Sequence, residues 1–149
     1  MSKRAIAVSV AGAVAVGGIA AGGVAAATAS TPLTVQSTSA RYTAPTSGND
    51  GALTVTAKVS DDSGVRGVKV LAWPKSSGLE PKKKEMTHAE NATCKETGEE
   101  RATCTYVLKV TPKDAARPAK GTWYVATLAT AEDGDTAFDP KAASFSIPR

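Results

Sequence analysis

The side chains best suited to chemistry in this sequence are carboxylates in two short acidic segments. Asp61 and Asp62 open the segment Asp-Asp-Ser-Gly, and Asp133 and Asp135 lie much later in Glu-Asp-Gly-Asp. Hard cations such as calcium bind several oxygen ligands together, so these four aspartates would form a calcium site if folding joined the two segments. Aspartate is also common in turns, because its side chain accepts hydrogen bonds from nearby backbone amides. The sequence alone leaves both interpretations open.

Basic side chains gather in two other segments and suggest a second kind of site. They are Lys82, Lys83, Lys84, Lys113, Arg117 and Lys120. A single patch of such residues at one end of a domain would attract an anionic partner, for example an anionic cell-wall polymer. An ordinary solvated run of lysines is the alternative explanation. The net charge of +4 is modest, and it does not call for nucleic acid as a partner.

Groups that could catalyse a reaction are few. His88 is the only histidine, and its Lys- and Glu-rich surroundings are typical of an exposed loop. The Gly-x-Ser-x-Gly motif of nucleophilic serines does not occur. Chain order does not decide against a Ser–His–Asp triad, because triads assemble in space. We predict no catalytic residues and keep an enzyme as a remote alternative.

The N-terminal segment, residues 1–29, is predicted to be a secretory signal peptide. A positively charged start precedes an uncharged run rich in Ala, Val and Gly, and Ala27-Thr28-Ala29 has the small residues of a cleavage site. We expect cleavage after Ala29 and a secreted, extracellular monomer with no membrane span. An uncleaved single-span anchor is the alternative. Residues 30–47 are expected to form a flexible start and an edge strand, and residues 48–149 the folded domain.

Cys94 and Cys104 are the only cysteines, and we predict a disulfide between them. Disulfides persist outside the cell, and Gly98 with its acidic neighbours indicates a hairpin turn between the two cysteines. Two thiols and one histidine are too few ligands for a closed zinc site, and the Cys-x-x-Cys spacing of a redox pair is missing. The bond is therefore expected to be structural.

Segments with alternating apolar and polar residues must position these groups. Residues 53–59 place Leu, Val, Ala and Val on one face and Thr, Thr and Lys on the other, which is typical of a half-buried β-strand. Related patterns over residues 65–73, 102–110 and 121–131 predict three more strands, and a last strand runs to Ile147. The Asp-Asp-Ser-Gly and Asp-Gly segments have the chemistry of turns.

Two short helices are expected between strands. Thr111-Pro112-Lys113-Asp114 is typical of a capping box with proline as the first helical residue, and predicts a single turn ended by Pro118. Within residues 75–93, Pro81 would begin a second short helix that continues through Met86.

About seven short strands separated by turns, with no long amphipathic helix, predict an immunoglobulin-like antiparallel β-sandwich. The segments Asp61-Asp-Ser-Gly-Val-Arg-Gly-Val-Lys-Val and Gly121-Thr-Trp-Tyr-Val-Ala-Thr-Leu-Ala-Thr-Ala-Glu-Asp-Gly-Asp resemble the B–C and F–G regions of bacterial immunoglobulin-like domains. The chain is also similar to a family of small exported proteins of unknown function from high-GC Gram-positive bacteria. The most distinctive segments of this similarity are Leu71-Ala-Trp-Pro-Lys-Ser-Ser and Gly121-Thr-Trp-Tyr-Val. This resemblance implies the fold and export, and it supplies no catalytic residues.

Trp73, Trp123 and Tyr124 are aromatic side chains that could stack against a carbohydrate. Adjacent residues of a strand point to opposite faces, so residues 123 and 124 cannot both lie on one such surface. We expect Trp73 and Trp123 to belong to the core.

These features favour a non-catalytic extracellular interaction or structural module that binds an extracellular protein or an anionic cell-wall polymer. The alternative function is a small secreted inhibitor of an extracellular hydrolase. Such an inhibitor would present the hairpin tip Lys95-Glu96-Thr97-Gly98.

Deleting residues 1–29 should leave the fold unchanged, because a targeting signal contributes no strand to the sandwich. The measurement is chemical denaturation of the shortened chain followed by far-ultraviolet circular dichroism. A single cooperative transition of a β-protein is expected. Loss of that transition would show that the segment is part of the fold.

Overall fold

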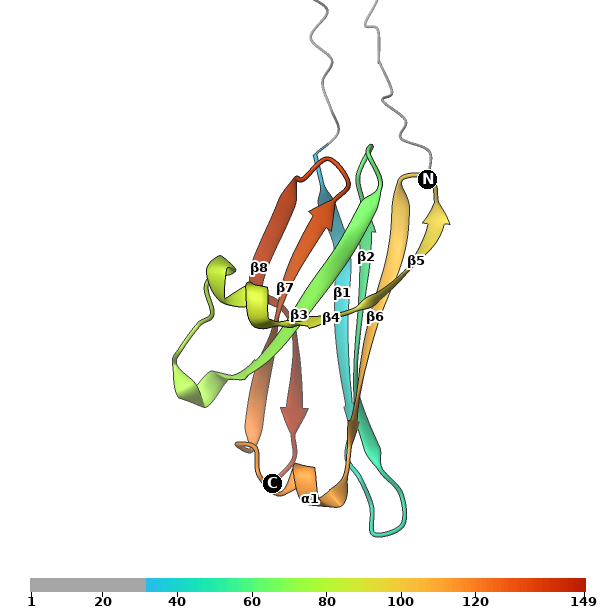
Figure 1. The fold of residues 1–149 in the computed structure, drawn as a ribbon. Helices are drawn as coiled ribbons and strands as arrows, with labels where there is room; N and C mark the ends of the chain where they lie inside the picture. The colour runs from blue at the N-terminus through green and yellow to red at the C-terminus, as the bar shows by residue number, and fades with distance from the viewer. Residues whose placement is uncertain (1–31) are drawn as a thin grey trace, which may run out of the picture.

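The computed structural model describes residues 32–149, and the predicted signal peptide lies outside them. The described chain consists of β-strands connected by turns and three short helical segments (Figure 1). The strands are β1 (Thr34–Thr43), β2 (Gly51–Ser60), β3 (Val65–Pro74), β4 (Glu90–Asn91), β5 (Thr93–Gly98), β6 (Arg101–Val110), β7 (Gly121–Ala131) and β8 (Thr136–Ile147). The helical segments are the 3-10 helices η1 (Lys75–Ser77) and η2 (Lys83–His88) and the α-helix α1 (Pro112–Ala115).

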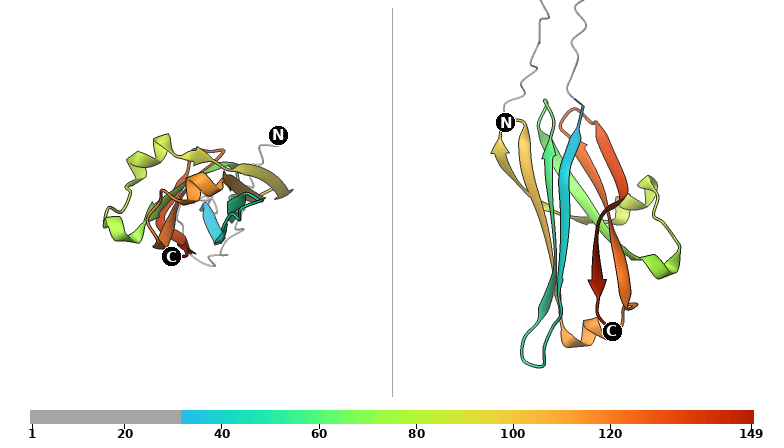
Figure 2. Two further views of the ribbon diagram at one scale, coloured as in Figure 1. Left: turned by 90° about the horizontal axis from the view of Figure 1, so that it is seen from below. Right: turned by 180° about the vertical axis from the view of Figure 1, so that it is seen from behind.

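The strands form two four-stranded antiparallel sheets with the orders β1-β2-β6-β5 and β4-β3-β7-β8. Figure 2 shows the two sheets as layers packed face to face. Strands A, B, E and D form one sheet of an immunoglobulin-like domain, and C, F and G form the other. The observed orders match this arrangement, with β4 added beside β3. The predicted immunoglobulin-like sandwich is therefore confirmed.

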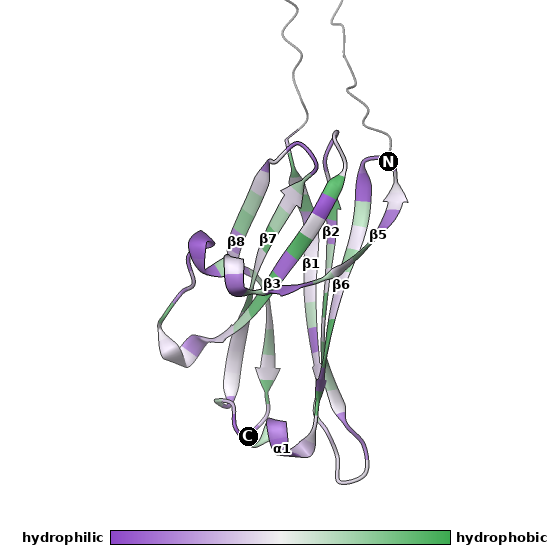
Figure 3. Ribbon diagram, in the orientation of Figure 1, coloured by the Kyte–Doolittle hydropathy of each residue, from purple (hydrophilic) through white to green (hydrophobic). Residues whose placement is uncertain are grey.

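The main core lies between the two sheets and is filled by the alternating residues of β2. Leu53, Val55, Ala57 and Val59 are all buried there, as their spacing predicts. From the facing sheet, β3 and β7 contribute the small apolar side chains that pack against them. Figure 3 shows the same alternation as hydrophobic and hydrophilic bands along β3. The core is thus built from β-branched and small residues, which fill a thin interlayer space.

A second apolar cluster covers the outer face of the β3–β7 pair. Trp73 and Ala126 point away from the main core and are buried under Met86 of η2, which is fully enclosed. The Trp73 indole N–H donates to the carbonyl oxygen of Pro140, 2.8 Å away, where the pairing of β7 with β8 is irregular. The segment 75–93 therefore acts as a lid over β3, and this explains why β3 is apolar on both faces.

The helix in this segment begins later than the sequence predicts. Pro81 was expected as its first residue, but the helix starts at Lys83 and runs to His88. Pro81 is buried just before it, and the Glu85 side chain accepts a hydrogen bond from the backbone N–H of Lys82 at 2.6 Å. The carboxylate of Glu85, rather than the proline, therefore marks the start of the helix.

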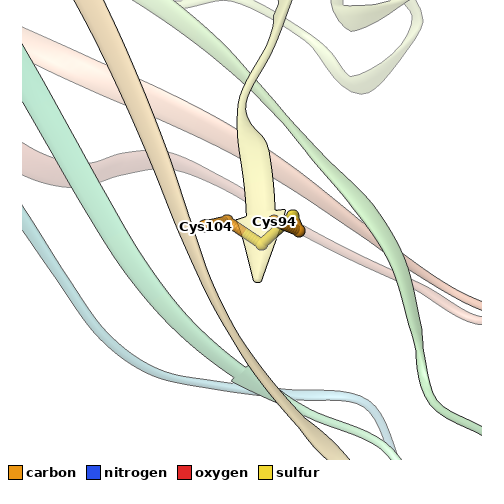
Figure 4. Close-up of a disulfide and its surroundings, with 2 residues drawn as sticks. All are labelled: Cys94 and Cys104. Atoms are coloured by element: carbon orange, nitrogen blue, oxygen red, sulfur yellow. A yellow bond between two sulfur atoms is a disulfide. The ribbon is translucent and has the colours of Figure 1, made fainter. Parts of the chain in front are cut away.

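The predicted disulfide between Cys94 and Cys104 is confirmed and crosses the β5–β6 hairpin (Figure 4). The two cysteines are direct partners in the antiparallel register, with Cα atoms 3.9 Å apart. Cys104 is buried in the main core and Cys94 packs against its edge. Because β5 is an edge strand, the bond attaches it to the sheet by more than backbone hydrogen bonds.

The predicted single helical turn at Pro112 is also confirmed. Thr111 caps it: its hydroxyl accepts from the N–H of Asp114 at 3.1 Å, and Asp114 Oδ2 accepts from the N–H of Thr111 at 3.2 Å. Hydrogen bonds from Thr111 hold the pKa of the Asp114 carboxyl below its usual value.

The edge strand expected within residues 30–47 is present: β1 pairs with β2 along its length, with one irregularity between Val35 and Ser37, and belongs to the first sheet. Trp73 is buried as predicted, whereas Trp123 is only half-buried and stacks on Phe145 at 6.0 Å between ring centroids. Trp123 lies near the start of β7, where the two sheets are no longer closed over each other.

Replacing both cysteines with alanine should lower the free energy of unfolding by about 3 kcal/mol, because the unfolded chain regains the freedom of a short closed loop. Urea denaturation of the variant and the parent measures this difference. Thr103→Ala on the same hairpin removes no crosslink and should change stability by about 0.5 kcal/mol at most. Alkylation of two thiols in the unreduced parent would contradict the disulfide.

Candidate functional site

Apart from the β3–β4 connection on the flank, the connections between strands gather at two opposite ends of the sandwich (Figure 1). We call one the acidic end: it holds the β2–β3, β5–β6 and β7–β8 turns, residues 61–64, 99–100 and 132–135. We call the other the α1 end: it holds the β1–β2 loop and the α1 segment, residues 44–50 and 111–120, with the C-terminus beside them. Each end carries one candidate site.

Three aspartates meet at the acidic end. Asp61, Asp133 and Asp135 each offer a carboxylate oxygen, and these oxygens lie within 4.8 Å of one another. Asp61 is 1% exposed, whereas Asp133 and Asp135 are open to solvent. The cluster therefore has one carboxylate at the edge of the core and two at the surface, joined from turns far apart in sequence.

Ser63 connects the two turns that carry these aspartates. Its hydroxyl donates to Asp61 Oδ2 at 2.5 Å and accepts from the backbone N–H of Asp133 at 3.0 Å. Its own backbone N–H donates to the same Asp61 oxygen at 2.8 Å. The carbonyl of Gly64, whose φ of 96° suits glycine, accepts from the N–H of Glu132 at 2.9 Å. The relative position of the carboxylates is therefore fixed by hydrogen bonds.

The other oxygen of Asp61 is left without a partner. Asp61 Oδ1 is buried and makes no hydrogen bond to any of residues 32–149. Burial raises the pKa of the Asp61 carboxyl, because desolvation disfavours its charged form. The hydrogen bonds from Ser63 lower the pKa, while the charges of Asp133 and Asp62 raise it further. A buried acceptor without a donor is destabilising unless something outside the chain satisfies it.

Charged neighbours surround the cluster but do not neutralise it directly. The Arg66 side chain contacts Glu132, with Nε 3.8 Å from a carboxylate oxygen and a terminal nitrogen 3.0 Å from the carbonyl oxygen. Lys83 Nζ donates to the hydroxyl of Thr136 at 2.6 Å, beside Asp135. Arg66 therefore lies at the rim of the acidic end, and the side chain of Lys83 reaches this end from η2.

Of the four aspartates in the predicted calcium site, the structure brings three together. Asp62 is not part of the group, although its charge acts on Asp61. Aspartate also has its ordinary role in turns here, which was the alternative to a calcium site, since Asp133 Oδ1 accepts from the N–H of Asp135 at 3.0 Å. Sequence reasoning missed the bridging role of Ser63; its position two residues after Asp61 in a turn was the available signal.

The basic residues do not form the single patch predicted. Lys82, Lys83 and Lys84 lie on the flank of the β3–β7 pair, with Lys83 at the start of β8. Lys113, Arg117 and Lys120 lie in the α1 segment, beyond the other end of β8. Twelve residues of β8 separate these positions, a distance of about 35 Å at the usual strand rise. The prediction was wrong because Met86 anchors the lysine run to the side of the sandwich.

The α1 end contains a cavity of about 510 Å³ between the two sheets. Most of its lining is apolar, including Leu53, Trp123 and Phe145, and Arg117 lies at its rim. Lys109 and Asp114 also line it; Lys109 is paired with Asp50 at 2.8 Å. A second hollow of about 320 Å³ adjoins it and shares Tyr42 and Ile147. The half-buried Trp123 is thus part of a wall rather than of the closed core.

The remaining candidate groups lie apart from both ends or at the surface. His88 is exposed at the end of η2, as the sequence predicts. The predicted hairpin tip Lys95–Gly98 is exposed as well, but it lies within β5, and the turn itself is formed by Glu99 and Glu100. Within residues 32–149, no helix has the length and apolarity needed to cross a membrane.

Fold and site together define a small disulfide-linked immunoglobulin-like sandwich with an acidic end and a hollowed end. The chain belongs to a family of unknown function, DUF5707, which matches residues 35–129. The matched residues include Asp61 and both cysteines and stop before Asp133 and Asp135. The resemblance to an uncharacterised family is thereby confirmed. No curated protein and no solved structure matches the chain.

Asp61→Asn should stabilise the protein in EDTA at neutral pH by about 1 kcal/mol, because it removes a buried charge and keeps an acceptor for Ser63. Since the folded-state pKa of Asp61 lies above its ordinary value of 3.8, the folded state holds more protons between the two values. The contribution of Asp61 to stability therefore falls as pH rises through that window.

The difference in free energy of unfolding between Asp61→Asn and the parent should accordingly grow from about pH 4 towards neutrality. Urea denaturation across this pH range measures it. Asp62→Asn, which removes the same charge from the same turn, is the control and should gain less. A variant less stable than the parent at neutral pH would count against this account of Asp61.

Proposed function

We propose that this protein is a non-catalytic extracellular interaction module that binds an anionic partner through its α1 end. The observation that carries the proposal is the cavity of about 510 Å³ with Arg117 at its rim. Its volume falls in the range of about 300–1,000 Å³ that is common for ligand sites. Its position at an open end of two rigid sheets leaves it accessible without a change in the fold.

The charge around this cavity favours an anion. Lys113, Arg117 and Lys120 are all exposed in the short α1 segment. Among the nearby acidic groups, Asp50 is paired with Lys109. Asp114 is hydrogen-bonded by Thr111 and offsets part of the charge of Lys113 and Arg117. Three cations against one such carboxylate leave a net positive charge, although Lys120 Nζ also donates to the carbonyl of Ala115 at 2.7 Å. An arginine can bind a phosphate or carboxylate through two parallel hydrogen bonds.

The apolar wall adds a second requirement for the partner. Trp123, Phe145 and Ile147 offer a surface that a purely ionic chain would not fill. A partner with repeated negative charges and short apolar or sugar-like parts fits both features. An anionic cell-wall polymer is such a partner, and secretion through the predicted signal peptide would bring the domain to it.

The alternative function, a hydrolase inhibitor that uses the Lys95–Gly98 tip, has less support. The β5–β6 turn is held to the sandwich by a hydrogen bond from the Asp61 N–H to the carbonyl of Glu100 at 2.8 Å. The tip is therefore short and attached, whereas an inhibitor needs a segment that enters a cleft.

Two triple variants test the proposal with equal changes in charge. Lys113→Ala/Arg117→Ala/Lys120→Ala should weaken binding to a soluble polyglycerol phosphate by about tenfold or more, as expected for three phosphate contacts. Lys82→Ala/Lys83→Ala/Lys84→Ala removes the same charge from the flank and should have a small effect. Binding is measured by titration calorimetry, after thermal unfolding has shown that both variants are folded.

Affinity of the parent should also fall as salt rises, because exposed charges are screened beyond about 10 Å at 0.1 M salt. Equal losses in both triple variants would mean that only net charge matters, and the α1 end would not be the binding site. No binding by the parent would contradict the choice of partner.

A further inference from the structure

We propose that Asp61, Asp133 and Asp135 form a calcium site at the acidic end. This inference concerns the end opposite to the proposed binding cavity and stands independently of it. It rests on two separate observations. Three carboxylates converge from two turns, and one oxygen of the buried Asp61 lacks any hydrogen-bond partner among residues 32–149.

The geometry suits a cation coordinated by oxygen. Calcium–oxygen distances of about 2.3–2.6 Å allow two ligand oxygens on opposite sides of the ion to lie up to about 5 Å apart. The carboxylate oxygens of the three aspartates lie within 4.8 Å of one another. Separations below this limit are compatible with one calcium ion shared by the three carboxylates. Water molecules would complete the shell from the solvent side, where Asp133 and Asp135 are exposed.

The ligand chemistry selects among metals. The group contains carboxylates alone, without the nitrogen or sulfur ligands that favour zinc and copper. Magnesium requires metal–oxygen distances of about 2.0–2.1 Å in near-ideal octahedral geometry. Magnesium also keeps several of its waters. Calcium accepts a more variable number and spacing of oxygen ligands, which suits a partly exposed set of three carboxylates.

Existing hydrogen bonds leave one oxygen of the buried Asp61 available. Asp61 Oδ2 is occupied by two donors from Ser63, which orients the carboxylate, while Oδ1 has none. Ser63 also accepts from the Asp133 backbone, so the same residue aligns two of the three ligands. A cation would satisfy the orphaned acceptor and offset the repulsion among the carboxylates.

Binding at this position would have a structural consequence. The β2–β3 turn crosses from one sheet to the other, whereas the β7–β8 turn lies within the second sheet. An ion bound by Asp61 in the β2–β3 turn and by Asp133 and Asp135 in the β7–β8 turn would link these two turns. It would thereby hold the connection between the sheets to the second sheet. Calcium should therefore stabilise the sandwich, not merely adhere to its surface.

The experiment titrates the purified, EDTA-treated protein with calcium chloride and, in parallel, with magnesium chloride. Titration calorimetry should give one calcium per chain with a dissociation constant of the order of 10⁻⁴ to 10⁻³ M, as in other extracellular sites. Thermal unfolding should show a rise in Tm of about 5 °C at about 10 mM calcium. Magnesium should bind more weakly and raise Tm less.

Three substitutions distinguish a built site from general attraction to acidic side chains. Asp61→Asn and Asp135→Asn should each weaken calcium binding about tenfold or more, and Asp62→Asn by no more than about twofold. Asp135 is exposed, so its replacement keeps the test valid if Asp61→Asn disturbs folding. Absence of calcium binding, equal weakening by Asp62→Asn, or a preference for magnesium would overturn the proposal.

Discussion

The face-to-face packing of two sheets is the constraint on which the rest of the molecule depends. Buried positions of β2 face those of β3 and β7 across one interlayer space, and this contact excludes water from the interior. Because each strand is antiparallel to its neighbours, the connections emerge at one of the two ends, except the segment between β3 and β4, which Met86 holds against the side. Packing in the centre therefore decides which polar segments become neighbours, although it involves none of them directly.

Asp61 is the point at which this packing and the polar ends meet. It follows directly after the last residue of β2, so the burial of that strand draws a carboxylate to the edge of the core. Ser63 donates hydrogen bonds to one carboxylate oxygen of Asp61, and the other oxygen has no donor. A natural domain retains such a group at a cost of about 1–3 kcal/mol, and a cation supplied from outside would account for its presence.

The two ends of the sandwich differ in how tightly the sheets close. At the acidic end, Ser63 and Gly64 accept hydrogen bonds from the backbone of the β7–β8 turn, and the polar groups are held in fixed positions. At the α1 end, Trp123 and Phe145 line an open space, and the cations lie at its edge. One end therefore suits a small ion with defined ligands. The other suits a larger partner that contacts both apolar and charged surface.

The sequence by itself determined the local features of this protein. Alternation in residues 53–59, the capping box at Thr111 and the turn glycine Gly64 each depend on contacts within a few residues, so strands, turns and one helix were predictable. The Cys94–Cys104 pair was predictable for the same reason, since a hairpin brings the two residues together. Only the tertiary structure decided that Asp61 meets Asp133 and that Lys83 lies far from Arg117. Those relations depend on how two sheets pack and on the burial of Met86, which no spacing within the chain encodes.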